Sequence, residues 1–120
     1  MSAPDRALLE DLLRSWAAGT LSEREVHSRA EMLFAEWGSP TFSRDDPRSI
    51  PAEVASQLDI LNHQWIFEDD IPAMLALLGT APGDEVVAWQ RWDEYWDGID
   101  FAERERKLAG RIYYVPRGRG

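Results

Sequence analysis

The sequence predicts an all-α fold: a single compact domain, built as an antiparallel helical bundle of about five to six helices with an irregular C-terminal arm. Two observations support this. Apolar residues recur at spacings of three and four along most of the chain, which is the period of one helix face. Capping residues and glycines separate these stretches. Only residues 111–115 suit an extended conformation, and a lone strand there would lack a partner.

The first two helices are predicted from clear start and stop signals. Pro4 suits a first helical turn and Gly19 ends the helix. Ser22 and Glu25 have the spacing of a capping box, and Gly38 ends the second helix. The apolar face of the first helix comprises Leu8, Leu9, Leu12, Leu13 and Trp16. That of the second comprises Val26, Ala30, Leu33 and Trp37, with Phe34 at its margin. The short link makes the two helices antiparallel neighbours.

Residues 39–49 form the one irregular stretch, and two further helices follow it. The third helix begins at Ser49 or Ile50. Either Asp69 or Asp70 is expected to cap the fourth, which ends at Gly79. The apolar face of the third helix comprises Val54, Leu58, Leu61 and Trp65. The face of the fourth comprises Ile71, Met74, Leu75 and Leu78.

The last two helices are expected at residues 84–97 and from Asp100 to about Leu108. Asp100 and Glu103 have capping-box-like spacing, and Gly98 and Gly110 act as stops. The fifth helix places four large apolar residues on one face: Val86, Trp89, Trp92 and Trp96. We therefore expect a helical bundle domain over residues 1–110 and an extended C-terminal tail over residues 111–120.

Composition narrows the class of protein. The chain has 120 residues, a formal net charge of -9 and no cysteine. The lack of cysteine excludes a disulfide framework and thiolate metal sites. Charged residues interrupt the first thirteen positions, and no apolar run approaches the length that spans a bilayer. These features predict a cytoplasmic protein without a membrane partner.

Charge is distributed unevenly along the chain. Residues 53–100 carry eleven acidic residues and a single basic one, Arg91, whereas residues 101–120 carry two acidic and six basic residues. An acidic surface repels nucleic acid and attracts basic proteins. The Arg117-Gly118-Arg119-Gly120 end is similar to a nucleic-acid-binding tail, but two arginines on an acidic chain are better interpreted as a solubilising end. We expect a basic protein partner and no direct nucleic-acid binding.

The chain offers little support for catalysis or cofactor binding. His27 and His63 are the only histidines, and no glycine-flanked serine forms a nucleophile elbow. No glycine-rich phosphate loop occurs. We therefore expect no enzyme activity, no catalytic residues and no cofactor.

Metal binding is the next hypothesis. Asp93 and Asp97 are four residues apart on one helix face, and residues 68–70 form a second acidic cluster. Hard cations need several oxygen ligands, but no EF-hand spacing or Glu-x-x-His pair is present. A solvated acidic face is the favoured interpretation, and no metal site is predicted.

Six tryptophans are the unusual feature of the composition. We interpret Trp16, Trp37 and Trp65 as core, because each falls on an apolar face. Core is also favoured for Trp89 and Trp92. Near the end of the fifth helix, aromatic rings alternate with carboxylates, a mixture that suits recognition of a basic surface. Core and interface both stay open for Tyr95.

The segment from Leu12 to Val26, with its Gly-Thr-Leu-Ser turn at residues 19–22, and the segments Ile50-Pro51-Ala52-Glu53-Val54 and Leu58-Asp59-Ile60-Leu61 carry a resemblance. They resemble the colicin D-type bacterial immunity proteins, small helical antidotes to nuclease toxins. The resemblance covers about the first half of the chain. It implies a cytoplasmic acidic protein whose carboxylates replace phosphates on a basic, RNA-binding toxin surface.

Together these observations predict an immunity protein that binds and neutralises a toxin. We expect its partner-binding residues to be Glu68, Asp69, Asp70, Asp93, Glu94, Tyr95, Trp96, Asp97 and Asp100. Three alternatives stay open. One is a phage-type inhibitor or nucleic-acid mimic that acts on a host effector. Another is a non-catalytic accessory subunit whose tryptophans form an oligomer. The third is a metal-dependent enzyme built on the acidic clusters. The oligomeric state is not predicted.

Overall fold

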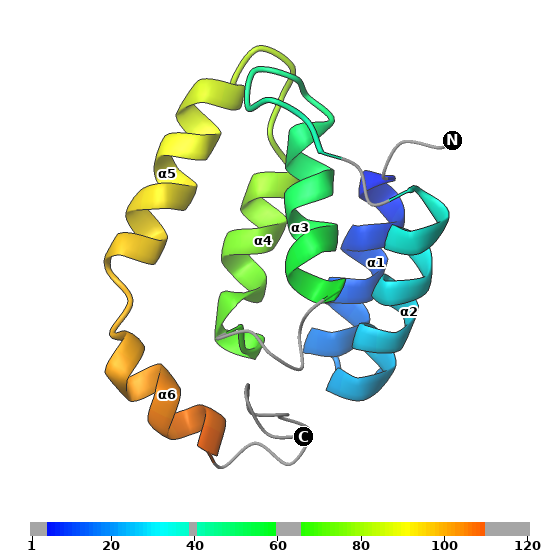
Figure 1. Cartoon of the computed structure of the whole chain (residues 1–120), viewed down its shortest axis with the longest axis vertical. Coiled ribbons are helices and arrows are strands. Elements are labelled where there is room, and N and C mark those ends of the chain that lie inside the picture. Colours follow the sequence, from blue (N-terminus) through cyan, green and yellow to red (C-terminus); the bar gives the residue numbers. More distant parts are fainter. Residues whose placement is uncertain (1–4, 39–40, 60–65, 110–120) are drawn as a thin grey trace.

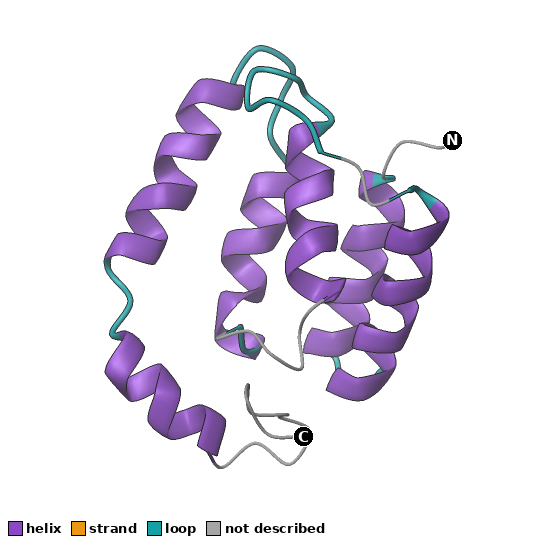
Figure 2. Cartoon of the chain, viewed as in Figure 1, coloured by secondary structure: helices purple, strands orange, loops and turns teal. Residues whose placement is uncertain are grey.

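A computed structural model of the chain describes residues 5–38, 41–59 and 66–109, and all regular structure in these ranges is helical. The elements are α1 (Arg6–Ala17), α2 (Glu23–Glu36), α3 (Ser49–Asp59), the short 3₁₀ helix η1 (Glu68–Asp70), α4 (Ile71–Leu78), α5 (Glu85–Asp97) and α6 (Phe101–Ala109). Figure 2 shows helices joined by loops, without a strand in the described part. The predicted all-α helical bundle is confirmed.

The helices fall into two groups. Helices α1 to α4 pack together, with α1 in contact with α2, α3 and α4. Helices α5 and α6 form an arc on the side opposite α1 and α2 (Figure 1), and α5 packs against α4. We call α1 to α4 the body and α5 with α6 the arm. The radius of gyration is 14.2 Å, a value typical of a compact domain of this length.

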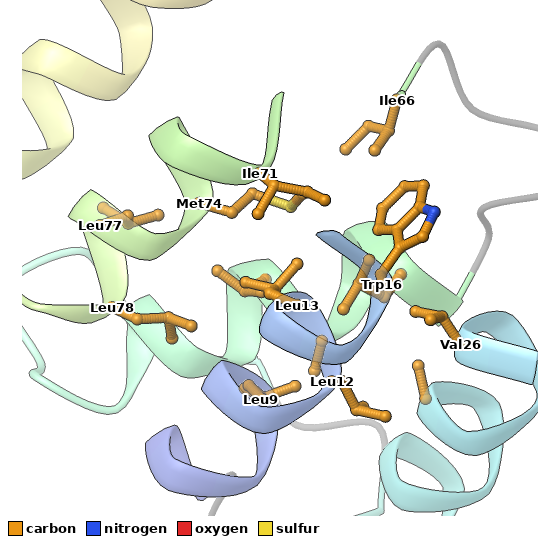
Figure 3. Packing of buried hydrophobic residues seen from close by; sticks show 14 of the residues in the cluster. Leu9, Leu12, Leu13, Trp16, Val26, Ile66, Ile71, Met74, Leu77 and Leu78 are labelled. Atoms are coloured by element: carbon orange, nitrogen blue, oxygen red, sulfur yellow. The ribbon is translucent and has the colours of Figure 1, made fainter. Parts of the chain in front are cut away.

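The body is held by an apolar core centred on α1. Leu9 and Leu13 have no exposed surface, and Trp16 is 3% exposed. Figure 3 shows Leu13 on the side of α1 that faces Ile71 and Met74 of α4, and Trp16 lying between Ile66 and Val26. Burying one such leucine stabilises the fold by about 1.5–3 kcal/mol. The α1 face predicted from residue spacing therefore forms the core, except at Leu8, which is 43% exposed.

The predicted helix boundaries are largely confirmed by their caps. The Ser22 hydroxyl accepts from the Glu25 amide at 3.2 Å, and the Ser22 amide donates to the Glu25 carboxylate at 3.0 Å. Gly19 and Gly38 have φ values of 79° and 82°, a left-handed conformation that favours glycine where a helix ends. Asp100 accepts from the Glu103 amide at 3.1 Å at the start of α6.

Hydrogen bonds between residues far apart in sequence join the start of α1 to the end of α4. The Arg6 guanidinium donates to the carbonyl oxygens of Leu78 and Thr80, each at 2.8 Å. These carbonyls lie at and just beyond the C-terminal end of α4, where a cation balances the unpaired acceptors. Arg6 therefore ties the start of α1 to the end of α4.

Two expectations about the helices need correction. Val86 is 75% exposed rather than part of the apolar face of α5, because α5 has a narrow buried side made by Trp89 and Trp92. Asp70 does not cap α4 with its side chain; instead, its carboxylate accepts from the Phe67 amide at 2.9 Å and closes η1.

Some predictions fall outside the described residues. These are the positions of Leu61 and Trp65 on the third helix, the place of His63 in the middle of that helix, and the extended tail at residues 111–120. Among the described residues, none of the helices combines the length and apolar character that a membrane span requires.

Candidate protein-binding surface

Asp70 is the centre of a buried polar cluster that joins the arm to the body. Its carboxylate has no exposed surface and accepts from Arg104 Nη1 at 2.6 Å and Nη2 at 2.7 Å. It also accepts from the Tyr95 hydroxyl and from the Phe67 amide. One residue of η1 therefore holds both α5, through Tyr95, and α6, through Arg104. We call Asp70, Tyr95 and Arg104 the anchor cluster.

The electrostatics of the anchor cluster favour a charged Asp70, a charged Arg104 and a neutral Tyr95. Burial by itself raises the pKa of Asp70, but the hydrogen bonds from Arg104, Tyr95 and Phe67 outweigh it and hold that pKa below its ordinary value. Burial, together with the hydrogen bond to Asp70, raises the pKa of Tyr95 to about 12. The hydrogen bonds to Asp70 raise the pKa of Arg104. At neutral pH the cluster is an ion pair with a neutral phenol donor.

This placement corrects one predicted site residue. Asp70 was expected to contact a basic partner, but both of its oxygens are occupied inside the fold and none of its surface is exposed. Exposing a buried carboxylate to a partner would require breaking its existing ion pair, which is strongly unfavourable. We therefore assign Asp70 to the fold and remove it from the candidate surface.

The aromatic residues of α5 divide between core and surface. Trp89 and Trp92 are buried, and their indole nitrogens donate to Ser49 Oγ and Glu53 Oε2, each at 3.2 Å. Both bonds attach α5 to α3. Tyr95 and Trp96 are half-buried. The predicted core position of Trp16, Trp37, Trp89 and Trp92 is confirmed.

Trp96 lies in a small aromatic cluster at the junction of α5 and α6. Its ring meets Trp92 and Tyr95 edge-on, at centroid distances of 5.6 and 5.5 Å, and stacks on Phe101 at 6.4 Å. Edge-on and offset arrangements are the favourable ones for aromatic pairs. Trp96 therefore fixes the orientation of α6 relative to α5.

The remaining acidic residues of the predicted site differ in how much of their charge is available. Asp93 is bound by Arg44 at 2.6 and 3.0 Å, and this hydrogen bonding holds the pKa of Asp93 below its ordinary value. Asp69 lies 3.4 Å from Lys107. By contrast, Glu68, Glu94 and Asp97 are exposed and form no ion pair among the described residues. Asp100 is exposed and caps α6.

The exposed acids form two groups rather than one. Glu94 and Asp97 are three residues apart on α5, so their side chains are neighbours on the helix surface, and Asp100 follows directly. Glu68 and Asp69 lie on η1, and within the described part of the chain no hydrogen bond or ion pair joins their side chains to the acids of α5. We call Glu94, Asp97 and Asp100 the acidic face. In the described residues, no group of three or more potential ligands is arranged to hold a metal ion.

The basic residues that organise the contacts of η1 and α5 were not predicted from the sequence. Arg104 and Lys107 hold η1, and Arg44 neutralises Asp93. One signal was present: Arg104 follows Phe101 by three residues and so lies on the same side of α6. Comparison with known proteins found no matching family model, no matching characterised protein and no matching solved structure.

Proposed function

We propose that this chain is a bacterial immunity protein that binds a nuclease toxin in the cytoplasm and neutralises it without catalysis. The toxin surface would be basic, because it normally holds RNA or DNA, and the carboxylates of this chain would take the place of phosphates. The proposal combines the resemblance of the first half of the chain with the electrostatics of the second half.

The observation that carries the proposal is the acidic face on a helix of fixed position. Glu94 and Asp97 are exposed and unpaired among the described residues, so their full charge is available to a partner. Tyr95, which directly follows Glu94 in the helix, is hydrogen-bonded to Asp70 and holds this part of α5 in place. Preorganised charge of this kind speeds association and selects basic partners without reordering side chains on binding.

The revised set of partner-binding residues is narrower than the set predicted from sequence. The acidic face supplies the principal contacts, and Glu68 and Asp69 supply charge at a second point. The exposed edge of Trp96 remains our proposed aromatic anchor. Tyr95 contributes through the rigidity of α5 instead, since its hydroxyl is used within the fold.

A neutralisation assay tests the proposal. The proposal predicts a toxin gene immediately upstream of the gene for this chain, and the catalytic domain of that toxin is expressed in sensitive cells together with the chain or a variant. The wild-type chain should restore growth and inhibit the purified nuclease. Glu94→Lys with Asp97→Lys should weaken inhibition by about tenfold or more, because two attractive contacts become repulsive.

The matched control is Glu31→Lys with Glu36→Lys, which makes the same change of net charge on the exposed side of α2, in the body. It should inhibit within about twofold of the wild-type chain. Equal losses in both double variants would mean that only net charge matters, and would contradict a specific acidic face. A neighbouring gene without a toxin, or a toxin that is not inhibited, would contradict the function itself.

A second candidate function, that of an accessory subunit in an oligomer, is favoured by a different observation. Leu8 and Met32 are 43% and 72% exposed, beside a groove of about 780 Å³ between α1 and α2 that Leu12, Leu21 and Leu33 also line. Exposed apolar residues around a groove are typical of a subunit interface. Sedimentation velocity across a hundredfold range of concentration tests this: association that Met32→Glu abolishes would support an accessory subunit, and a monomer throughout would reject it.

A further inference from the structure

A pocket beside the acidic face combines aromatic walls with a partly open carboxylate. It has a volume of about 280 Å³ and lies between α3, α5 and the start of α6, lined by Trp92, Trp96, Phe101, Gln57 and Glu53, with Ile66 and the Arg44–Asp93 pair also contributing. Phe101 is 40% exposed, so the pocket opens to solvent on the α6 side. The proposed function does not assign any role to this pocket.

Glu53 gives the pocket its charge. Its Oε2 atom accepts from Trp92 Nε1 at 3.2 Å and from Gln57 Nε2 at 3.0 Å, whereas its Oε1 atom accepts from no described group. The other two charged groups of the lining neutralise each other, because Arg44 binds both oxygens of Asp93. One negative charge is therefore left in a half-buried, ring-lined pocket.

The walls are suited to a flat cation. Trp96 and Phe101 stack with an interplanar angle of 14°, and Trp92 meets Trp96 at 78°, so the pocket presents both faces and edges of aromatic rings. The face of an aromatic ring attracts a cation, and a planar guanidinium can stack on it while its N–H groups bind a carboxylate.

An arginine that is bound by a carboxylate and lies over an aromatic ring already occurs in this chain next to the pocket. The Arg44 guanidinium lies 4.3 Å from the centre of the Trp89 ring while it is bound by the Asp93 carboxylate. Arg104 repeats the arrangement with the Asp70 carboxylate and the Phe67 ring, at 5.3 Å. Glu53 with Trp92 and Trp96 offers a third carboxylate–aromatic group, which lines a cavity; Arg44 attracts Glu53 electrostatically but directs its hydrogen bonds to Asp93.

Trp96 carries an unsatisfied polar atom. Its indole nitrogen is buried and has no hydrogen-bond acceptor, the sole buried side-chain polar atom of the described residues in that condition. Buried donors are almost always paired in folded proteins. The residue with this unpaired donor also forms one wall of the pocket.

We propose that this pocket binds a single arginine side chain of the partner, with the guanidinium on Glu53 Oε1 and against the Trp92 and Trp96 rings. This assignment rests on the proposed function for the basic character of the partner. The acidic face would attract that partner over a distance, and the pocket would hold one of its arginines at short range.

The test uses the full chain and a tripeptide probe, N-acetyl-Ala-Arg-Ala-amide, with lysine and citrulline peptides as comparisons. Indole N–H resonances are followed by NMR during titration. The arginine peptide should give saturable shifts of the Trp92 and Trp96 indoles. The lysine peptide should bind more weakly, because an ammonium does not stack, and the citrulline peptide, which is uncharged, should give none.

Paired variants separate the pocket from general charge. Glu53→Gln removes the charge but preserves an oxygen acceptor, and it should weaken the arginine peptide by about tenfold or more. Glu36→Gln makes the same charge change at an exposed position of α2 that does not line the pocket, and it should stay within about twofold of the wild-type chain. Phe101→Ala, at a half-exposed wall, should weaken binding several-fold. Should Glu53→Gln fail to fold, the arginine–citrulline comparison on the wild-type chain decides the matter.

Two results would overturn the proposed arginine site: equal binding of the arginine and citrulline peptides, or an equal loss of arginine-peptide binding in Glu53→Gln and Glu36→Gln. The experiments distinguish a wrong arginine-binding proposal from a wrong immunity function. Toxin inhibition without peptide binding would reject the pocket and keep the immunity function, whereas peptide binding without toxin inhibition would keep the pocket and reject the function.

Discussion

The body and the arm of this molecule are held by different forces. Helices α1 to α4 bury a continuous apolar cluster that includes Leu9, Leu13 and Val54 without any exposed surface. The arm buries only Trp89 and Trp92 from α5, and α6 is attached through Arg104, Phe101 and Lys107. The body is therefore stabilised by many interchangeable contacts, whereas the arm depends on a few specific ones.

The difference matters for function because the proposed binding residues lie on the arm and beside it. A rigid acidic face on a thin arm requires an attachment that resists rotation, and directional hydrogen bonds supply this better than apolar contact does. The anchor cluster is thus the structural condition for the proposed activity, and it can be separated from the stability of the body by substitution.

The largest effect is expected in the body. Leu13→Ala should lower the free energy of unfolding by about 2–5 kcal/mol, because it leaves a cavity in a core with little freedom to collapse. Chemical denaturation followed by tryptophan fluorescence measures the change. Loss of structure in the arm at the same denaturant concentration is expected, since α5 packs on α4. An arm that stays folded at denaturant concentrations that unfold the body would contradict the dependence of the arm on the body.

A smaller but more local effect is expected for Arg104→Met. Removing one partner of a buried ion pair typically costs about 3–5 kcal/mol, but here the cost should be lower because α6 can detach and rehydrate Asp70. Hydrogen exchange should show α6 amides losing protection while those of α1 keep theirs. Uniform loss of protection in body and arm would contradict the local attachment of α6.

Tyr95→Phe should cost about 1–2 kcal/mol, because it removes one hydrogen bond to a charged group. The raised pKa of Tyr95 also fixes a pH dependence. Its contribution to stability is fully present below pH 10, the ordinary value for tyrosine, and is lost as the pH rises toward about 12. The wild-type chain should therefore lose stability across this window, and Tyr95→Phe should show a smaller loss.

The smallest effect is expected for Asp93→Asn, which breaks the pair with Arg44. Both side chains are about half exposed, so water and salt screen the pair, and the loss should be below about 1 kcal/mol. Thermal unfolding in low and high salt measures it. A loss as large as that of Arg104→Met would mean that the exposed pair, rather than the anchor cluster, holds the arm.

The sequence predicts the body well because the body is built from periodic patterns. Trp16 and Trp37 were assigned to the core from their helix faces, and the Ser22 cap from its spacing to Glu25. The prediction that Val86 lies on the buried face of α5 is wrong because this helix packs along a narrow side only. Three tryptophans on one helix face do not require a fourth residue of that face to be buried.

The arm is less predictable because its contacts join residues far apart in sequence. Asp70 and Arg104 are 34 positions apart, and no periodic pattern marks which of three consecutive acids turns inward. The same holds for Glu53 and Trp92, which are 39 positions apart. Composition predicted an acidic segment, but the structure was needed to separate the carboxylates used within the fold from those that remain available.

The central claim is that an unpaired acidic face on a fixed arm attracts a basic partner. Stopped-flow measurement of the association rate with the catalytic domain of the proposed toxin partner, at several salt concentrations, tests it most directly. The wild-type rate should fall steeply with salt, and Glu94→Lys with Asp97→Lys should be about tenfold slower at low salt, with a flatter salt dependence. Identical rates and salt slopes for the wild-type chain and this double variant would contradict the claim.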